Sequence, residues 1–293
     1  MISSATRITL AAIGVAVSFC TVAAQEQSSQ CANMGSEAVL QSPTMTVSTL
    51  NISHGRNSAL NQMFVSTKRT YENLDKIVAL LDKIDADVVA LQEADAKSKW
   101  SGKFDHVQYL VENSRLDCYV HGRQARSWLY SYGTALLSKS ALADSSSFEF
   151  KPTPPTTTKG FVRARIDWSV NGKIIPVTIV SVHLDFSRRK VRDSQIAELI
   201  EELGDLETEL IIMGDLNSTW SDKRPHVRQL AEGLELTAYD PDGPELGTYQ
   251  SVSGKRLDWI LISSNLEFLS YEVLPDVVAD HLAVTAEIRV TGD

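Results

Sequence analysis

After its first 24 residues, the sequence has no hydrophobic segment of membrane-spanning length, no internal repeat and no zinc-like spacing of Cys and His. These absences argue against a transmembrane, solenoid or zinc-finger protein. Basic residues are not in excess either, since 28 Lys and Arg stand against 37 Asp and Glu, a net charge of −9. The overall field of an acidic chain does not attract polyanions, which counts against a high-affinity nucleic-acid binder. It does not count against a metal enzyme with carboxylate ligands.

The amino terminus has the pattern of a secretory signal peptide. Arg7 provides a short basic start, residues 8–19 are apolar, and residues 22–24 form a small-residue cleavage site. We therefore expect residues 1–24 to be removed, which leaves a mature net charge of −10 and a secreted or periplasmic protein with no transmembrane segment. Lipoprotein-type attachment at Cys20 is the weaker alternative, because a bulky residue precedes it.

Two cysteines, Cys31 and Cys118, remain in the mature chain. In an oxidising compartment they could form one disulfide, and two unpaired thiols are the alternative because the sequence does not give their distance. Residues 25–44 are small and polar, which is typical of a flexible lead-in. Residues 45–293 form one predicted domain, since 43% of the chain is hydrophobic and no linker divides it. We expect a monomer.

The hydrophobic pattern changes repeatedly between strand and helix periodicity. It predicts strands at 46–52, 87–93, 118–122, 132–137, 161–170, 174–182, 210–213, 257–262 and 282–290, and helices at 71–84, 103–113, 189–203 and 223–233. Asn171-Gly172 is a strong hairpin signal, so the sheets cannot be purely parallel. The mixture favours two packed sheets with helices outside, an α/β (α+β) fold.

Polar side chains stand at the ends of several of these apolar strands. They are Asn51, Glu93, His183, Asp215, Asn217, Asp280 and His281, with Asp258 early in a further strand. Asp215 and Asn217 should share one face, because residues i and i+2 of an extended chain point to the same side. For a residue taken alone, such as Glu93 or His183, a turn residue, a solvated acid or a hydrogen-bonded histidine is the simpler explanation. Their repetition at strand ends favours a common site on a rigid scaffold.

The residue types indicate metal-assisted chemistry. Glu93, Asn51 and Asp280 offer the oxygen ligands that a hard divalent cation such as Mg²⁺ prefers. Histidine is a poor ligand for such a cation, so His183 and His281 suit proton transfer and phosphate contact. A partner acid such as Asp258 would hold one imidazole in its tautomer.

The ordered set of short motifs resembles the endonuclease/exonuclease/phosphatase superfamily, which includes DNase I-like nucleases, sphingomyelinases and inositol-phosphate phosphatases. The matching pieces are Leu50-Asn51-Ile52, Leu91-Gln92-Glu93, Tyr132-Gly133-Thr134-Ala135-Leu136-Leu137-Ser138, Val182-His183-Leu184, Gly214-Asp215-Leu216-Asn217, Leu257-Asp258-Trp259 and Asp280-His281. The resemblance implies a four-layer sandwich of two mixed, largely antiparallel β-sheets flanked by helices. It also implies a Mg²⁺-dependent phosphoester hydrolase, with Mn²⁺ or Ca²⁺ as alternative metals.

The resemblance also implies a role for each matching residue. Glu93 would be the principal metal ligand beside Asn51 and Asp280, while His281 would be the general base oriented by Asp258. His183 would contact the phosphate and assist the leaving oxygen, and Asp215 and Asn217 would position the water and the phosphoryl oxygens. The sequence departs from the family at Ser53, where nuclease relatives often have an acid.

The sequence leaves the substrate open between a phosphodiester, including nucleic acid or a phospholipase C- or sphingomyelinase-type lipid, and a phosphomonoester. Arg188, Arg189, Lys190 and Arg192 could clamp a phosphate, although a solvated helix face is the simpler interpretation for at least two of them. Trp100, Trp128 and Trp220 could stack a base or meet lipid, with partial burial as the simpler expectation. A non-catalytic binding protein on the same scaffold is the hypothesis from another class.

Overall fold

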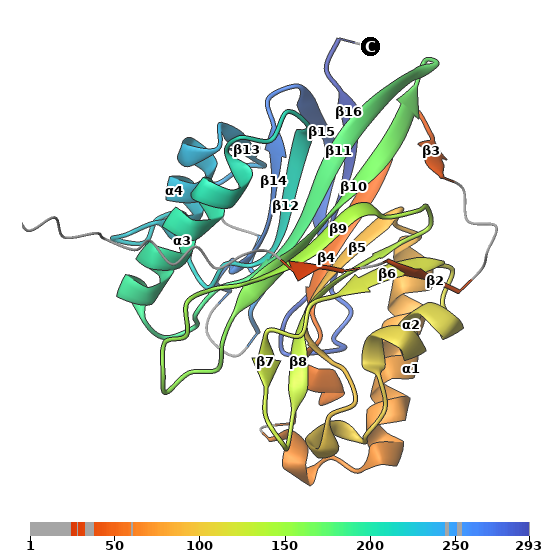
Figure 1. Cartoon of the computed structure of the whole chain (residues 1–293), viewed down its shortest axis with the longest axis vertical. Helices are drawn as coiled ribbons and strands as arrows, with labels where there is room; N and C mark the ends of the chain where they lie inside the picture. Colours follow the sequence, from red (N-terminus) through yellow and green to blue (C-terminus); the bar gives the residue numbers. More distant parts are fainter. Residues whose placement is uncertain are drawn as a thin grey trace, which may run out of the picture.

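The computed structural model describes residues 25–27, 29–32, 38–59, 61–243, 246–250 and 254–292, so the predicted signal peptide lies outside the described residues. Two β-sheets pack face to face in the middle of the molecule, and helices cover the outer face of each (Figure 1). The four-layer sandwich of mixed, largely antiparallel sheets is therefore confirmed.

The first sheet consists of strands from the amino terminus and from the middle of the chain. In spatial order its described strands are β1 (Gln25–Glu26), β9 (Ala143–Glu149), β10 (Gly160–Val170), β11 (Lys173–His183), β12 (Glu209–Asp215), β14 (Asp258–Ser263) and β13 (Leu236–Ala238), and β3 (Val39–Gln41) pairs with β10. The β11–β12 and β3–β10 pairs are parallel and the others are antiparallel. The long β10–β11 hairpin turns at Asn171 and Gly172, as predicted.

The second sheet joins the two ends of the domain. Its described strands are β15 (Leu266–Val273), β16 (Val284–Val290), β4 (Met45–Asn51), β5 (Val88–Asp95), β8 (Ser131–Ser138), β6 (Cys118–His121) and β2 (Gln30–Cys31), and β7 (Ala125–Arg126) pairs with β8. The β4–β5 pair is parallel, and the other pairs are antiparallel.

Three apolar layers hold the sandwich together. The central layer lies between the sheets and includes Val47, Trp168, Ile179 and Met213. The outer layers pack α1 (Thr67–Ile84) and α2 (His106–Asn113) on the second sheet, and α3 (Arg189–Leu203) and α4 (His226–Gly233) on the first. Among the described residues, three short 3₁₀ helices, η1 (Ser53–Gly55), η2 (Gln62–Phe64) and η3 (Lys99–Ser101), lie in the connections. None of the described helices combines the length and the apolar character that a bilayer crossing requires.

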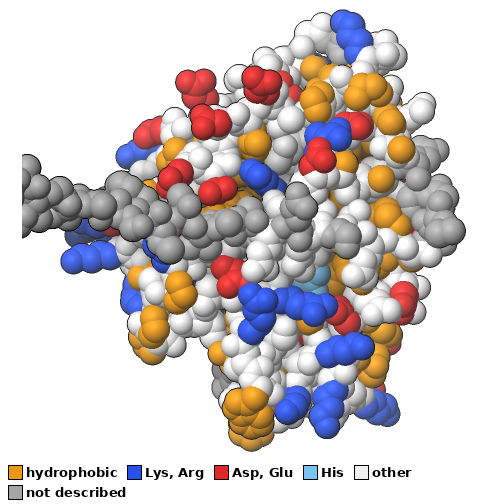
Figure 2. Space-filling model, in the orientation of Figure 1, with side chains coloured by type: hydrophobic (Ala, Val, Ile, Leu, Met, Phe, Trp, Pro, Cys, Tyr) orange, Lys and Arg blue, Asp and Glu red, His pale blue; other side chains and the backbone are white. Residues whose placement is uncertain are grey.

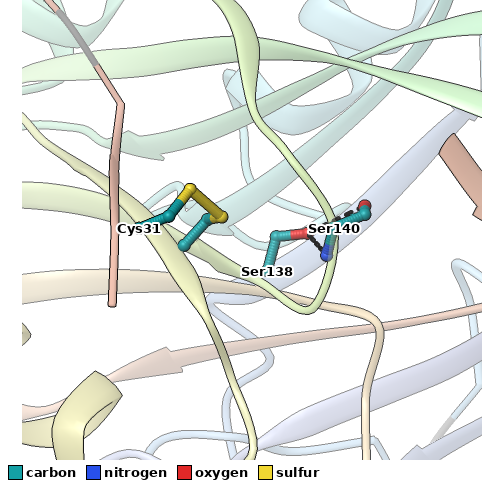
Figure 3. Close-up of a disulfide and its surroundings, with 4 residues drawn as sticks. Cys31, Ser138 and Ser140 are labelled. Carbon is teal, nitrogen blue, oxygen red and sulfur yellow. Dashed lines mark hydrogen bonds between the residues drawn. A yellow bond between two sulfur atoms is a disulfide. The ribbon is translucent and has the colours of Figure 1, made fainter. Parts of the chain in front are cut away.

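The described part of residues 25–44, for which we expected a flexible lead-in, contributes the short strands β1, β2 and β3. Cys31 on β2 forms a disulfide with Cys118 on β6, to which it is directly paired (Figure 3). Ser138 and Ser140 hydrogen-bond to each other close to this disulfide. The bond closes a sequence separation of 87 residues, so it ties the amino-terminal segment to the second sheet.

Candidate active site

Strand direction brings the predicted residues to one edge of the sandwich. Because β11 and β12 are parallel, His183 and Asp215 are direct partners at their carboxyl ends. Antiparallel β14 begins at the same edge, where Asp258 is the partner of Asp215. In the second sheet, parallel β4 and β5 likewise end together, which places Asn51 near Glu93. The strand ends that the sequence predicted from periodicity therefore meet.

Local backbone conformation aims these side chains. Gly214 has a φ of +147°, and a Cβ atom there would lie 2.0 Å from the carbonyl oxygen of Val182, so only glycine allows β12 to approach β11 so closely. Glu93 has a φ of 50° at an irregularity in the β5–β8 register, which turns its carboxylate toward the site. Asn217 (φ 48°) and His54 (φ 56°) also have positive φ. Such conformations concentrate at functional sites, where the surrounding structure enforces them.

One cavity of about 500 Å³ gathers the predicted residues. Its lining includes Asn51, Glu93, His183, Asp215, Asn217, Asp280 and His281. Asp258 does not line the cavity but lies behind His281, fully buried. All eight residues singled out in the sequence thus belong to one site, as either its lining or its immediate support.

His281 is held between two carboxylates. Its Nδ1 lies 2.7 Å from Asp258 Oδ2, and its Nε2 lies 3.8 Å from Asp215 Oδ2. Burial disfavours the charged imidazolium, but Asp258 and then Asp215 outweigh burial and raise the pKa of His281 to about 10. Burial raises the pKa of Asp215 to about 7, against the opposing pull of His281. Asp258 also accepts a hydrogen bond from Thr248 Oγ1, which fixes the carboxylate that orients the imidazole.

His183 lies beside a cation that the sequence analysis did not identify. Nζ of the buried Lys159 is 3.3 Å from His183 Nδ1, and Asp215 Oδ2 is 3.5 Å from His183 Nε2. Burial and the charge of Lys159 hold the pKa of His183 well below its usual range, so the imidazole is neutral. A neutral imidazole can donate one hydrogen bond to a phosphoryl oxygen and accept one on its other nitrogen.

The three predicted metal ligands present oxygen atoms to the cavity. Glu93 Oε2 lies 3.2 Å from His54 Nε2, and Asp280 Oδ2 accepts from Arg56 Nη2 at 2.8 Å. Asn51 Oδ1 accepts from the backbone of Ser53, while Asn51 Nδ2 donates to Asp215. Each carboxylate oxygen can accept further ligands. This oxygen-rich set therefore fits a hard divalent cation in its chemistry, with cationic side chains as competing partners.

A second group of potential ligands overlaps the predicted catalytic residues. Ligand atoms of Asp215, Asp258 and His281 all lie within 4.8 Å of one another. The buried Asp258 Oδ1 has no hydrogen-bond partner among the described residues. A cation near Asp215 would therefore find ligand atoms on this side as well. The site thus offers metal ligands both around Glu93 and around Asp215.

Several residues of the site had no predicted role. Lys159 follows a proline-rich loop, where a lysine is typically solvated, and His54 and Arg56 belong to the loop after Asn51. Of the basic run after His183, Arg189 and Arg192 line the cavity. Arg188 instead binds Asp185 and the backbone of the loop containing Thr153 and Pro154, and Lys190 is exposed. Arg56 lies five residues after Asn51, which is the one local indication that it could belong to the site. Its charge alone does not distinguish a site arginine from a surface arginine.

The three tryptophans for which a binding role was considered differ in solvent exposure. Trp100 and Trp220 are partly buried, as expected. For Trp128 the expectation was wrong, because 78% of its surface is exposed. It lies in the short connection between β7 and β8.

Solved structures share this fold at low sequence identity. An endonuclease/exonuclease/phosphatase protein from Beutenbergia cavernae is 16% identical, with a TM-score of 0.67 over 86% of this chain and 72% of that chain. The human Nocturnin catalytic domain with bound sulfate is 17% identical, with a TM-score of 0.64 over 85% and 95%. The mannosyl-6-phosphatase of Bacteroides thetaiotaomicron is 16% identical, with a TM-score of 0.61 over 83% and 99%. No curated protein sequence matches the chain.

The sequence itself also identifies the family. Residues 48–281 match the model of the endonuclease/exonuclease/phosphatase family, whose members are mostly phosphoester hydrolases. The matched region begins just before Asn51 and ends at His281, so it spans the whole cavity-lining set described above. The chain therefore belongs to the endonuclease/exonuclease/phosphatase family.

Proposed function

We propose that the protein is an exported, divalent-metal-dependent phosphoester hydrolase. The observation that carries the proposal is the cavity in which carboxylates, two asparagines and two histidines from five separate strand ends converge. Family membership supports phosphoester hydrolysis in general. Export rests on the pattern of residues 1–24, and a location outside the cytoplasm is compatible with the disulfide.

The residues divide into a proton-transfer group and an orienting group. His281 is the proposed general base for the attacking water, and Asp258 fixes its tautomer through the 2.7 Å contact. Asp215 and Asn217 orient the water and the phosphoryl oxygens, and neutral His183 donates a hydrogen bond near the leaving oxygen. Lys159, 3.3 Å from His183, adds positive charge where the phosphoryl oxygens gain negative charge.

Glu93, Asn51 and Asp280 would hold the divalent cation, Mg²⁺ being our first expectation and Mn²⁺ or Ca²⁺ the alternatives. A cation held there would polarise phosphoryl oxygens and offset the negative charge of the site carboxylates. That offset would matter for His281, because Asp258 and Asp215 raise its pKa to about 10 and so favour its protonated form. His281 would act as a base where the pull of these two carboxylates on its proton is reduced.

The shape of the site favours a compact substrate. A cavity of about 500 Å³ holds a ligand of small-molecule size rather than a duplex. Cationic side chains from three segments, Arg56, Arg189 and Lys255, line it, which suits an anionic phosphoester. A small phosphomonoester or phosphodiester, or a lipid head group, is therefore the preferred substrate class over double-stranded DNA.

The test is turnover of bis(p-nitrophenyl) phosphate and of p-nitrophenyl phosphate by the purified protein, with Mg²⁺, Mn²⁺ or Ca²⁺ and with EDTA. We expect metal-dependent turnover that EDTA abolishes. His281→Ala should lower kcat by at least ~100-fold with little change in KM, as for a proton-transfer residue. The same panel includes DNA, sphingomyelin and inositol phosphates. Absence of turnover on every substrate with every metal would leave the non-catalytic binding hypothesis instead.

A further inference from the structure

One end of the molecule carries large apolar side chains that are exposed among the described residues. Phe64 is 89% exposed, Trp128 is 78% exposed and Met63 is 62% exposed. Met63 and Phe64 lie on η2, and Trp128 lies between β7 and β8, so two separate segments present them. A single exposed apolar side chain is ordinary, but several large ones gathered at one place on the surface indicate an interaction site.

The same end is locally basic although the chain as a whole is acidic, and three of its cations, Lys68, Arg123 and Arg126, are paired with the nearby acids Glu72, Asp105 and Glu149. Residues 61–69, 97–103 and 123–130 contain seven Lys and Arg and no Asp or Glu. Lys97, Lys99 and Lys103 are exposed, and no ion pair joins them to a carboxylate within the described ranges. Figure 2 shows Lys and Arg side chains gathered over the lower end of the molecule, next to hydrophobic side chains at its tip, whereas Asp and Glu are more frequent above.

Backbone hydrogen bonds and side-chain contacts connect these segments in space. The backbone amides of Lys99 and Trp100 donate to the carbonyl oxygen of Leu129, and Lys99 Nζ lies 5.3 Å from the centre of the Trp128 ring. η2 in turn contacts η3. Figure 1 shows the β7–β8 connection and the start of α1 together at this lower end. We call Met63, Phe64, Trp128, Lys97, Lys99 and Lys103 the basic–aromatic tip.

The basic–aromatic tip is adjacent to the cavity. Trp100, which follows Lys99, contacts His54 at 5.1 Å between ring centres, and His54 Nε2 lies 3.2 Å from Glu93 in the cavity lining. A partner seated on the tip would therefore lie within a few side chains of the site. The negative charge of the rest of the molecule would turn the tip toward a negatively charged surface.

We propose that the basic–aromatic tip is a contact surface for an anionic lipid bilayer. Trp, Phe and Met insert shallowly at a membrane interface, and neighbouring lysines bind anionic head groups, each contributing roughly a fivefold gain in binding. Single-stranded nucleic acid is the competing partner, but it is bound in grooves where aromatic rings lie side by side for stacking. The tip instead projects its apolar side chains outward, which suits a deformable surface.

The experiment is sedimentation of the purified protein with vesicles of phosphatidylcholine alone or mixed with phosphatidylglycerol. One variant combines Phe64→Ala with Trp128→Ala, and a second combines Lys97→Ala, Lys99→Ala and Lys103→Ala. The matched control, Lys173→Ala with Ile174→Ala, removes an exposed lysine and an exposed apolar side chain from the β10–β11 hairpin at the opposite end. All proteins carry the same amino terminus, so any contribution of residues 1–24 cancels.

We expect preferential binding to the anionic vesicles, weakened by NaCl, and a loss of at least ~10-fold in each tip variant but not in the control. Equal binding of both vesicle types, or equal loss in the control, would overturn the proposal. So would binding of single-stranded DNA that the tip variants weaken while vesicle binding stays unchanged. Turnover of a soluble phosphoester without vesicles should not change in either tip variant, which separates this outcome from failure of the proposed hydrolase function.

Discussion

Asp258→Asn gives the sharpest test of the proposed proton-transfer group. In the structure Asp258 is fully buried, and its Oδ2 lies 2.7 Å from Nδ1 of His281. The rise in the pKa of His281 from its ordinary value near 6.5 to about 10 corresponds to roughly 5 kcal/mol of preference for the imidazolium, with Asp258 as the largest favourable contributor. Asparagine keeps the shape but removes the charge, so this preference should largely disappear.

The first readout is the pKa of His281 in EDTA, followed by NMR. Asp258→Asn should bring it back toward 6.5, because the buried ring loses the charge that favours its protonated form. The second readout is turnover with metal, for which we expect kcat to fall ~10²–10⁴-fold while KM changes little, since the imidazole loses its fixed tautomer.

The pH dependence of stability provides a third readout. A His whose pKa is raised in the folded chain contributes stability that is fully present below its unfolded pKa and is lost as the pH rises through the folded value. The free energy of unfolding of the metal-free protein should therefore decline between about pH 7, where Asp215 is half deprotonated, and about pH 10. Asp258→Asn should flatten this decline.

Asp185→Asn is the matched control for Asp258→Asn. Asp185 is also fully buried near the same strand ends, but it accepts hydrogen bonds from Arg188 and Thr156 and does not touch His281. The control should lower stability and leave the pKa of His281 unchanged. An unchanged His281 pKa together with kcat within about threefold of wild type in Asp258→Asn would refute the proposed pairing.

Three further changes test other parts of the structure. Glu93→Ala should weaken Mn²⁺ binding, measured by titration calorimetry, by at least ~10-fold with an unchanged circular dichroism spectrum, and full activity at low Mg²⁺ would contradict the ligand assignment. Lys159→Met should raise the pKa of His183 toward its ordinary value, because the neighbouring positive charge is lost, and lower kcat/KM by ~10²-fold; an unchanged His183 titration by NMR would exclude this coupling. Cys31→Ser should lower the free energy of unfolding by up to about 5 kcal/mol in urea, as the 87-residue separation implies, while turnover persists; a midpoint that is the same with and without reductant in the wild type would show that the disulfide does not constrain the unfolded chain.

Periodicity predicted the buried elements well and the exposed ones poorly. Helix α3 was predicted at its observed bounds, but α1 begins at Thr67, four residues before the predicted start. Its first turn has no apolar residue, and its start is fixed by the Ser66 side chain, which accepts from the amide of Arg69. Strand β15 was missed because it is an edge strand with a half-exposed, irregular pattern. Strand β9 was missed because its serines do not favour strands, although several are buried.

The site was predictable to the extent that its residues end buried strands. Asp215 and Glu93 each follow an abrupt change from apolar to polar residues, so the local sequence is enough to identify them as candidates. Lys159 carries no such signal, since it is the fold that buries its ammonium against His183. The same holds for Arg56, whose ion pair with Asp280 joins residues 224 positions apart. Partners chosen by tertiary packing are not encoded in any local spacing.

The site lies at the interface between the two sheets, which explains why its residues are scattered along the sequence. His183, Asp215 and Asp258 belong to the first sheet, whereas Asn51 and Glu93 belong to the second. Hydrogen bonds cross this interface directly. Asn51 Nδ2 donates to Asp215 Oδ2 at 3.1 Å, and Ser181 Oγ donates to the carbonyl oxygen of Leu91 at 2.9 Å.

Neither sheet alone contains both the proposed metal ligands and the proton-transfer pair. The distance between these two groups of residues is set by the apolar layer between the sheets, where Met45, Val47, Ile179 and Met213 are fully buried. A close-packed layer resists small displacements, because each methylene removed or added shifts its neighbours. The positioning of the proposed catalytic groups therefore depends on core residues that never touch the substrate, and substitutions in this layer should affect turnover before they unfold the chain.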